Sequence, residues 1–294
     1  MKFEKFSFKD NTGKKTTFTC DESKLANFFG KNVDAPNFLT KVFFKKEVLD
    51  RYYGKPSKYS IVDGYLLYTR DDGVNEWGMP IDNNTEDCVM VYLGDLGKLP
   101  NEEQKYWKLF NITEGNSSIV SFRRDYQAEF CSPTEPALYF KEKFKIFNNE
   151  WNKKFGWNLF KPLSEEDKHH LKTLRVPSNE QKEFDEVVLS LNKLIIDSLN
   201  TKEMKKNLIF DRGDNSISIL KKYLEQKHKV NVPLMMEFLR DLQNLRSSGS
   251  AHRKGDNYTK AYKRFDKGSL SKTFEGILVG AITTINTIEN KCIK

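Results

Sequence analysis

The sequence predicts an α+β protein, with a mixed α/β N-terminal domain over residues 1–160 followed by an all-α helical bundle over residues 178–294. Short β-prone runs with turn signals dominate the first part, whereas apolar residues at helical spacing dominate the second. Residues 161–177 form the junction, because this stretch combines prolines with a charged cluster and few aromatic residues. At 294 residues the chain is long enough to build two hydrophobic cores.

Several strands are expected in the N-terminal domain. Phe6 and Phe8 alternate with polar residues, which is the period of a half-buried strand. The dipeptide Asp63–Gly64 between YSIV and YLLY predicts a hairpin, because glycine readily adopts the positive φ of a tight turn. The continuous apolar run 88–93 predicts a strand buried on both faces. Helices are expected over residues 102–110 and 139–155.

The C-terminal part shows only helical periodicity. Ser178 and Gln181 have the spacing of a capping box, and Pro233 suits the first turn of a helix. Apolar stripes run over residues 184–195, 216–226, 233–245 and 270–288. Four amphipathic helices with short connections predict a helical bundle.

Composition favours a protein that stays in the cytoplasm. Charged residues make up 31% of the chain, and no run approaches the ~18 apolar residues of a membrane span. The start of the chain interleaves Phe with Lys and Asp, unlike a signal peptide. The four cysteines form no CxxC pair and are expected to be reduced. No histidine has ligand-like spacing to a cysteine, so we expect no metal and no other cofactor.

The positive charge is concentrated in one segment. The chain carries a net charge of +8. Residues 240–272 contain nine Lys and Arg against three acidic residues, so this segment alone accounts for +6. Positive charge that is concentrated in one segment indicates a polyanionic partner more strongly than uniform basicity does.

The same segment contains a pair of residues with chemical potential. Arg246 is the first residue after the third apolar stripe, and His252 follows six positions later. Only small residues (247–251) separate them, and Gly249 is expected to loosen or end the helix. In a continuous helix, six residues correspond to about 600° of rotation and about 9 Å of rise, a gap that the arginine side chain can span.

This pair suits the cleavage of RNA. Attack by the ribose 2′-OH needs a group that exchanges protons near neutral pH, and histidine is the side chain with an ordinary pKa in that range. It also needs a fixed positive charge on the phosphate, which a guanidinium supplies with two parallel hydrogen bonds. The scheme requires no metal.

Arg246-x5-His252 at a helix end, with bundle helices on both sides, resembles the R-x4–6-H motif of the HEPN superfamily over residues 178–294. The resemblance implies a metal-independent endoribonuclease that works as a homodimer, with Arg246 and His252 as catalytic residues and Ser247 and Ser250 in support. It also implies a role in toxin–antitoxin, abortive-infection or other antiviral defence. Ser247 departs from the family pattern, where Asn, Asp or His often follows the arginine.

Additional RNA contacts are expected directly after the motif. Basic and aromatic residues there could follow a backbone and stack on bases: Arg253, Lys254, Tyr258, Lys260, Lys263 and Arg264. A basic run can equally be a solvated face. Two weaker candidates are a phosphate contact at Arg123–Arg124 and the pair His169–His170, which is expected to be exposed.

Other functions remain open alternatives. The bundle could be a degenerate, non-catalytic module for dimerisation and nucleic-acid binding. The chain could also be a DNA-targeting effector, with Asp95, Lys98 and the pair Glu102–Glu103 as a metal-nuclease pattern in the N-terminal domain. In the main hypothesis that domain recognises a phage or host trigger and holds the nuclease inactive until the signal arrives.

Overall fold

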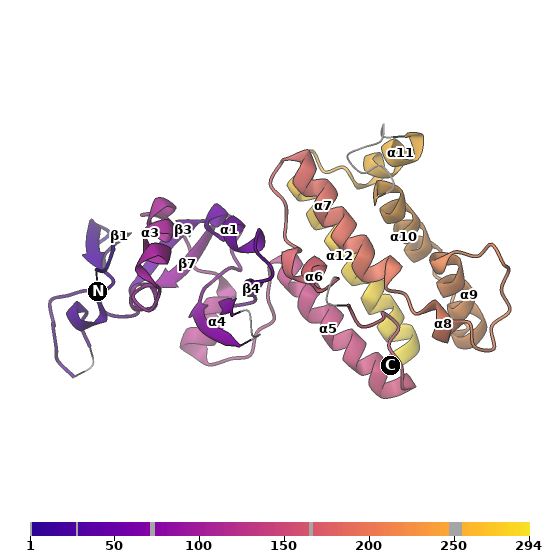
Figure 1. Ribbon diagram of the computed structural model, residues 1–294, viewed down its shortest axis with the longest axis horizontal. Coiled ribbons are helices and arrows are strands. Elements are labelled where there is room, and N and C mark those ends of the chain that lie inside the picture. The colour runs from indigo at the N-terminus through magenta and orange to yellow at the C-terminus, as the bar shows by residue number, and fades with distance from the viewer. Residues whose placement is uncertain (1, 28, 71–73, 165–166, 247–254) are drawn as a thin grey trace. The chain divides into compact units, whose positions relative to one another are not determined.

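The chain folds into two units, Met1–Leu138 and Tyr139–Lys294, coloured indigo to magenta and magenta to yellow in Figure 1. The computed structural model describes residues 2–27, 29–70, 74–164, 167–246 and 255–294. Small antiparallel sheets occupy the first unit and helices occupy the second, which confirms the mixed α+β prediction. The units divide at Leu138/Tyr139, whereas the junction predicted from the sequence lies at residues 161–177.

Unit 1 contains three small antiparallel sheets among its described residues. They are formed by β1 (Lys5–Lys9) and β2 (Lys15–Thr19), by β7 (Cys88–Tyr92), β3 (Lys41–Lys45) and β8 (Asn111–Ile112), and by β4 (Tyr59–Val62), β5 (Tyr65–Thr69) and β6 (Asn75–Pro80). The predicted Asp63–Gly64 hairpin is confirmed, because it joins β4 to β5 and Gly64 has a φ of +79°. The predicted buried strand is also confirmed, since four of the five residues of β7 are buried.

Aromatic side chains form the centre of unit 1. Phe6 of β1 meets Phe44 of β3 edge to face at 5.8 Å, and Phe44 meets Trp107 at 4.8 Å between ring centroids. All three side chains are fully buried. The helices around this core are η1 (Glu22–Lys24), η2 (Lys46–Leu49), α1 (Asp50–Tyr53), α2 (Leu93–Leu96), α3 (Asn101–Leu109) and α4 (Ile119–Gln127). The predicted alternation of Phe6 and Phe8 therefore produces a strand with one buried face.

The described part of unit 2 is helical. Its elements are α5 (Pro136–Phe155), α6 (Lys168–Thr173), α7 (Gln181–Asn192), α8 (Thr201–Met204), α9 (Ser216–His228), α10 (Pro233–Arg246), α11 (Asp256–Phe265) and α12 (Leu270–Ile288). Short π-helices continue two of them: η3 (Lys193–Asp197) follows α7 and η4 (Glu289–Ile293) follows α12. Helix α10 packs against α7, α9, α11 and α12, as Figure 1 allows the reader to follow. All four predicted amphipathic helices are present.

Most of helix α5, from Tyr139 onwards, belongs to unit 2. Its Phe147 and Trp151 side chains are fully buried, and the Trp151 ring lies 6.5 Å from Tyr223 of α9. Lys143 forms an ion pair of 2.5 Å with Glu289 of η4. The helix predicted over residues 139–155 is therefore confirmed, and its partners are helices that follow it in the sequence.

One local expectation is wrong. Helix α7 begins at Gln181 with Glu180 as its N-cap, so Ser178 and Gln181 do not form a capping box. The Ser178 backbone N–H instead donates to the carboxylate of Glu183 at 2.8 Å. A carboxylate in the first turn, which the helix dipole favours, takes over the contact that the sequence pattern assigned to Gln181.

Cys20, Cys88, Cys131 and Cys292 are free thiols. A search of the described helices finds none with the length and apolar character that crossing a membrane requires.

Candidate functional site

Arg246 is the last residue of α10. The helix buries Met235, Leu239, Leu242 and Leu245 in the bundle, and the arginine follows directly after this apolar face. Its side chain is 32% exposed. Arg246 therefore lies, as predicted, at the end of an amphipathic helix, and its side chain is accessible to solvent.

The guanidinium of Arg246 binds a carboxylate from another helix. Its Nη1 lies 2.6 Å from Oδ1 and 2.7 Å from Oδ2 of Asp197, the last residue of η3. Lys193 of the same π-helix lies 3.4 Å from Asp197 Oδ2. Within the described ranges, the guanidinium forms no other hydrogen bond or ion pair, so the N–H groups on Nε and Nη2 have no acceptor there. One nitrogen anchors the group, and the other two can donate to a ligand.

The energetic value of this ion pair to the fold is small. The side chains of Arg246 and Asp197 are each about one third exposed, at 32% and 31%. Solvent screening at that exposure limits a salt bridge to roughly 0–1 kcal/mol. The main effect of Asp197 is therefore to fix the orientation of the guanidinium rather than to stabilise the bundle.

A buried amide fixes the two helices that bring the pair together. Asn192, the last residue of α7, is fully buried, and its Nδ2 donates to the carbonyl oxygens of Val188 (2.9 Å) and Leu242 (3.1 Å). Leu242 lies on α10, one turn before Arg246. This bond fixes the position of α7 along α10. As a result, the end of η3 lies beside the end of α10, where Asp197 meets Arg246. The π-helical form of η3 is itself a feature often found near functional sites.

His170 lies in the same neighbourhood. It is buried, and its Nδ1 is 3.1 Å from Ser190 Oγ on α7. Burial lowers the pKa of His170 below its ordinary value of 6.5, the adjacent His169 lowers it further, and the charges of Lys193 and Asp197 act on it in opposite directions. His170 is thus a largely neutral imidazole at pH 7. The prediction that both residues of the His169–His170 pair are exposed is correct for His169 and wrong for His170.

Several predicted site residues lie outside the described residues. These are Ser247, Ser250, His252, Arg253 and Lys254. Arg246 is therefore the one member of the predicted catalytic pair whose surroundings the structure describes.

Helix α11 carries the remaining predicted RNA contacts. Lys260 and Lys263 are exposed, as a backbone-binding role requires. Arg264 is exposed but forms ion pairs of 2.7 Å with both Glu237 and Asp241 of α10, so its charge is already compensated. Tyr258 is only 7% exposed and stacks on Tyr262 at 5.9 Å, so its ring is not accessible to a nucleobase. Helix α11 is amphipathic and buries Tyr258 on its inner face, so the predicted stacking of this residue on a base is wrong.

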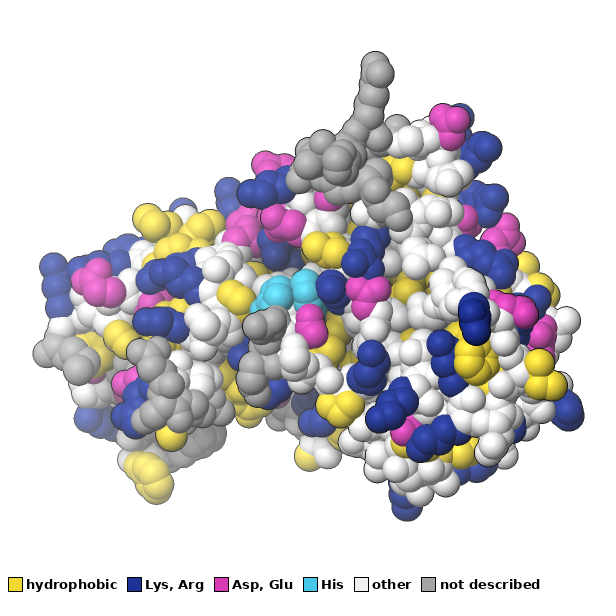
Figure 2. All heavy atoms as spheres, turned by 45° about the vertical axis from the view of Figure 1, so that its right-hand side comes forward, with side chains coloured by type: hydrophobic (Ala, Val, Ile, Leu, Met, Phe, Trp, Pro, Cys, Tyr) yellow, Lys and Arg dark blue, Asp and Glu magenta, His cyan; other side chains and the backbone are white. Residues whose placement is uncertain are grey.

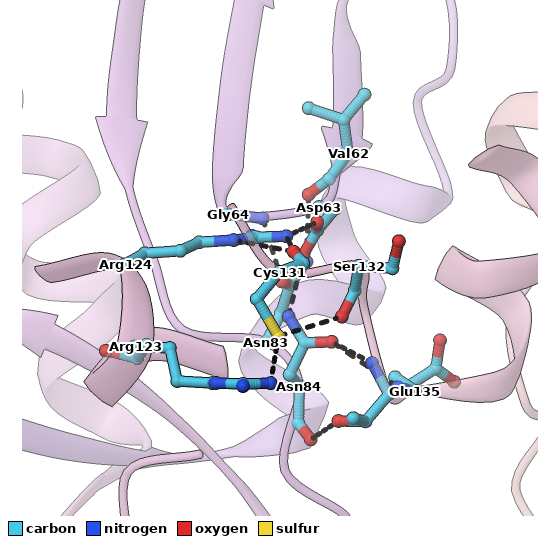
Figure 3. Close-up of polar contacts among 12 residues, drawn as sticks. Val62, Asp63, Gly64, Asn83, Asn84, Arg123, Arg124, Cys131, Ser132 and Glu135 are labelled. Atoms are coloured by element: carbon cyan, nitrogen blue, oxygen red, sulfur yellow. Dashed lines mark hydrogen bonds and ion pairs between the residues drawn. The ribbon is translucent and has the colours of Figure 1, made fainter. Parts of the chain in front are cut away.

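The Arg123–Arg124 pair of α4 serves a local network in unit 1 (Figure 3). Arg124 Nη2 binds Asp63 at 2.6 Å and also the carbonyl of Cys131, to which Nε donates at 3.0 Å. Arg123 pairs with Glu129 at 3.1 Å. Arg124 therefore holds the chain after α4 against the β4–β5 turn, whereas Arg123 binds only within the segment that follows α4 among the described residues. Their charges are compensated by neighbouring carboxylates, which argues against a phosphate contact here.

The acidic residues considered for a metal nuclease are bound to separate partners. Asp95 pairs with Lys98 at 2.8 Å and Glu102 with Lys105 at 2.7 Å. Glu103 is buried, and its carboxylate accepts the hydroxyl of Tyr52 at 2.6 Å. Among the residues that the structure describes, no group of three or more His, Cys, Asp or Glu side chains could hold a metal ion.

Surface charge alone does not locate a site. Figure 2 shows Lys and Arg side chains spread over the visible face, with acidic side chains among them. The residues that distinguish the end of α10 are instead Asp197 and Lys193, neither of which is among the residues predicted from the sequence. Asp197 lies 49 positions before Arg246, and its only sequence signal is the Lys193-x3-Asp197 spacing at the end of the first apolar stripe. Comparison of the chain with protein-family models, with curated proteins and with solved structures finds no match.

Proposed function

We propose that the protein acts on RNA through the end of α10, and that unit 2 is a HEPN-like endoribonuclease domain. The support is threefold: a helical bundle, an arginine at the end of a bundle helix, and a histidine six positions later in the sequence. Arg246 and His252 are the proposed catalytic residues, with Ser247 and Ser250 in support.

One observation carries the proposal. Asp197 holds Arg246 through Nη1 alone, and the side chain remains about one third exposed at 32%. A guanidinium that is oriented through one nitrogen, and whose other two nitrogens bind no acceptor among the described residues, is suited to bind a phosphate with two parallel hydrogen bonds. An anchored charge also needs little reorganisation when negative charge develops on the phosphate.

The proposed reaction uses the RNA's own hydroxyl. The 2′-oxygen attacks phosphorus, a new P–O2′ bond forms, and the P–O5′ bond breaks. His252 accepts the 2′-OH proton, and the departing 5′-oxygen takes up a proton from the imidazolium or from water. Arg246 binds the non-bridging oxygens throughout. The products are a 2′,3′-cyclic phosphate and a 5′-OH end.

The biological setting forms part of the same proposal. A cytoplasmic homodimer would bring two copies of the motif together, as the HEPN resemblance implies. Unit 1 would respond to a phage or host trigger and restrain the nuclease, because unregulated RNA cleavage poisons the cell that makes it. This would be an antiviral-defence effector of the abortive-infection or toxin type.

The direct test is cleavage of total RNA by the purified protein in the presence of EDTA. We expect cleavage that persists with the chelator and falls by at least about 100-fold in Arg246→Ala and in His252→Ala. Arg212→Ala is the matched control, since Arg212 is an exposed arginine in unit 2 outside the site. Cleavage that EDTA abolishes, or that both site variants retain, refutes the assignment.

A second candidate is a non-catalytic module for dimerisation and nucleic-acid binding. The contact that favours it is the same ion pair, because Asp197 with Lys193 and Arg246 can also be a purely structural cluster at a helix end. In that case the protein binds RNA without cutting it, and Asp197→Asn leaves binding unchanged. The cleavage assay separates the two candidates.

A further inference from the structure

The outer face of the β1–β2 hairpin has an unusual distribution of charge. Phe6 and Phe8 turn into the core, so Lys5, Ser7 and Lys9 of β1 lie on the opposite face. The register places Lys5 opposite Thr19, Ser7 opposite Thr17 and Lys9 opposite Lys15 on β2. This face therefore consists of ammonium and hydroxyl groups, all of which can donate hydrogen bonds.

The lysines on this face are not all neutralised. Two like charges directly opposite one another destabilise a strand pair, as Lys9 and Lys15 do here. Lys9 is compensated by Glu114 at 2.7 Å. Lys5 and Lys15 are exposed and form no ion pair with any residue in the described ranges. Lys5 and Lys15, together with Lys9, therefore give this face of the hairpin a net positive charge that suits an anionic ligand.

A groove runs along this face. It has a volume of about 780 Å³ and lies between the hairpin, the end of α3 and β8. Figure 1 shows β1 of the hairpin beside α3. Lys5, Lys15 and Lys108 line it together with the hydroxyls of Ser7, Thr17 and Thr113. Glu114 is the single acidic residue of its lining, and no aromatic side chain contributes to it.

The groove is preformed. Asn111 joins its two walls, because its Oδ1 accepts the Ser7 N–H at 2.7 Å while its Nδ2 donates to the Ser7 carbonyl at 3.0 Å. Lys108 is held by Glu4 at 2.6 Å, and the hydroxyls of Ser7 and Thr17 lie 2.8 Å apart. These bonds hold Asn111, Lys108 and the two hydroxyls in place, so these groups lose little conformational entropy when a ligand binds.

We propose that this groove binds the phosphate backbone of single-stranded RNA, as a second contact remote in sequence from Arg246. Ammonium and hydroxyl donors recognise phosphate oxygens, and three lysines spread over the hairpin and the end of α3 suit several phosphates rather than one ion. The lack of an aromatic platform means that bases are not stacked, so binding is independent of sequence. The inference rests on the proposed action on RNA, and it assigns to unit 1 the role of holding the substrate strand.

The test is RNA binding without turnover. A fluorescently labelled single-stranded RNA is titrated with the full chain carrying His252→Ala, with and without Lys5→Gln and Lys15→Gln. Loss of two phosphate contacts should raise Kd about tenfold and reduce the slope of log K against log salt by about 1.4. The control is Lys55→Gln with Lys58→Gln, which removes the same charge from exposed lysines outside the groove.

The outcomes separate this inference from the proposed function. An equal loss of affinity in the groove variant and the control variant means that general charge is responsible, and it overturns the inference. Unchanged affinity in the groove variant does the same, even where Arg246→Ala abolishes cleavage and the nuclease proposal stands. A selective loss in the groove variant supports the inference even if the protein cuts no RNA. The same loss of affinity for a single-stranded DNA of equal length supports recognition through phosphates. An affinity for RNA that does not change with salt concentration contradicts it.

Discussion

Arg246 and Asp197 lie 49 positions apart in the sequence, yet Nη1 of the arginine is within 2.6 and 2.7 Å of the two carboxylate oxygens. Both residues end a helical segment, α10 and η3 respectively. The carboxylate meets only one of the three guanidinium nitrogens. This relationship sets the direction of the guanidinium at the point where α10 ends.

Asp197→Asn should impair activity much more than stability. The amide carries no charge and offers one acceptor oxygen in place of two, so it holds the guanidinium less firmly. If the protein cleaves RNA as proposed, we expect cleavage to fall by roughly 10-fold to 100-fold. The free energy of unfolding should fall by less than about 1 kcal/mol, because the pair is partly exposed. Single-turnover cleavage and urea unfolding measure the two effects. Asp211→Asn, which removes an exposed partner of Lys222, is the control. Equal activity in the two variants contradicts the role given to Asp197.

Asn192→Ala should destabilise unit 2. The substitution removes the bond from Nδ2 to the Leu242 carbonyl and leaves that buried oxygen without its partner from α7. Loss of a buried hydrogen bond of this kind costs about 1–3 kcal/mol. Equilibrium unfolding in urea gives the value. Asn257→Ala, at an exposed position of α11, should change stability little. If both variants unfold at the same urea concentration, α7 and α10 are not joined as described.

The stability of unit 1 should fall in alkaline solution. The buried Tyr52 hydroxyl donates to Glu103 at 2.6 Å and accepts from Trp107 Nε1 at 2.7 Å. Burial, followed by the contact with Glu103, raises the pKa of Tyr52 above its ordinary value of 10.0. Burial also raises the pKa of the Cys20 thiol from 9.0 to about 11. Both groups lose their protons more readily in the unfolded chain.

These pKa shifts make the free energy of unfolding fall as pH rises. Stability is complete below the unfolded pKa values and is lost as pH rises through about 9 to 11 and beyond. Urea unfolding at intervals from pH 7 to 11 should show a plateau and then a decline. Tyr52→Phe removes the tyrosine contribution, so it should lower stability at neutral pH by about 1–3 kcal/mol and make the decline shallower. A flat profile up to pH 11 in the unmodified chain contradicts the burial of these two groups.

Gly97→Ala should destabilise unit 1 through a steric clash. A Cβ at this position would lie 2.1 Å from the backbone carbonyl oxygen of Cys20, which cannot rotate away as a side chain could. Overpacking of this kind costs about 1–3 kcal/mol. Thermal unfolding is the measurement, and Gly213→Ala is the control because no atom lies within 4 Å of the added carbon. Matching melting temperatures for the two variants would show that the Cys20 backbone can move away from the end of α2 at little cost.

Local patterns in the sequence predict much of the secondary structure. The apolar stripes define the four helices α7, α9, α10 and α12, because each helix buries one face and the spacing records that face. The Asp63–Gly64 hairpin is equally local, since the turn needs the positive φ that Gly64 adopts. Partners are less predictable. Helix α5 carries the right spacing, but nothing in its residues says that Glu289 and Tyr223 will pack against it.

The candidate site shows the same division. Arg246 is identifiable from its place after an apolar stripe, which is a property of neighbouring residues. Asp197 is not, because its partner is set by how α7 and α10 pack across 49 positions. Tyr258 shows the reverse case. An aromatic residue in a basic segment fits a stacking role by composition, but the helix turns it inwards and leaves it 7% exposed.

Helix α5 determines where the chain can be divided. It begins at Pro136, and its Trp151 and Phe147 side chains fill the interior of the helical unit. A fragment that starts after residue 160 would leave an apolar trough where this helix belongs, and it should aggregate rather than dissolve. Separate expression of the helical unit therefore has to start ahead of Pro136. A linker inserted near residue 170 would interrupt the helical unit, because this position lies within unit 2 and not between the two units.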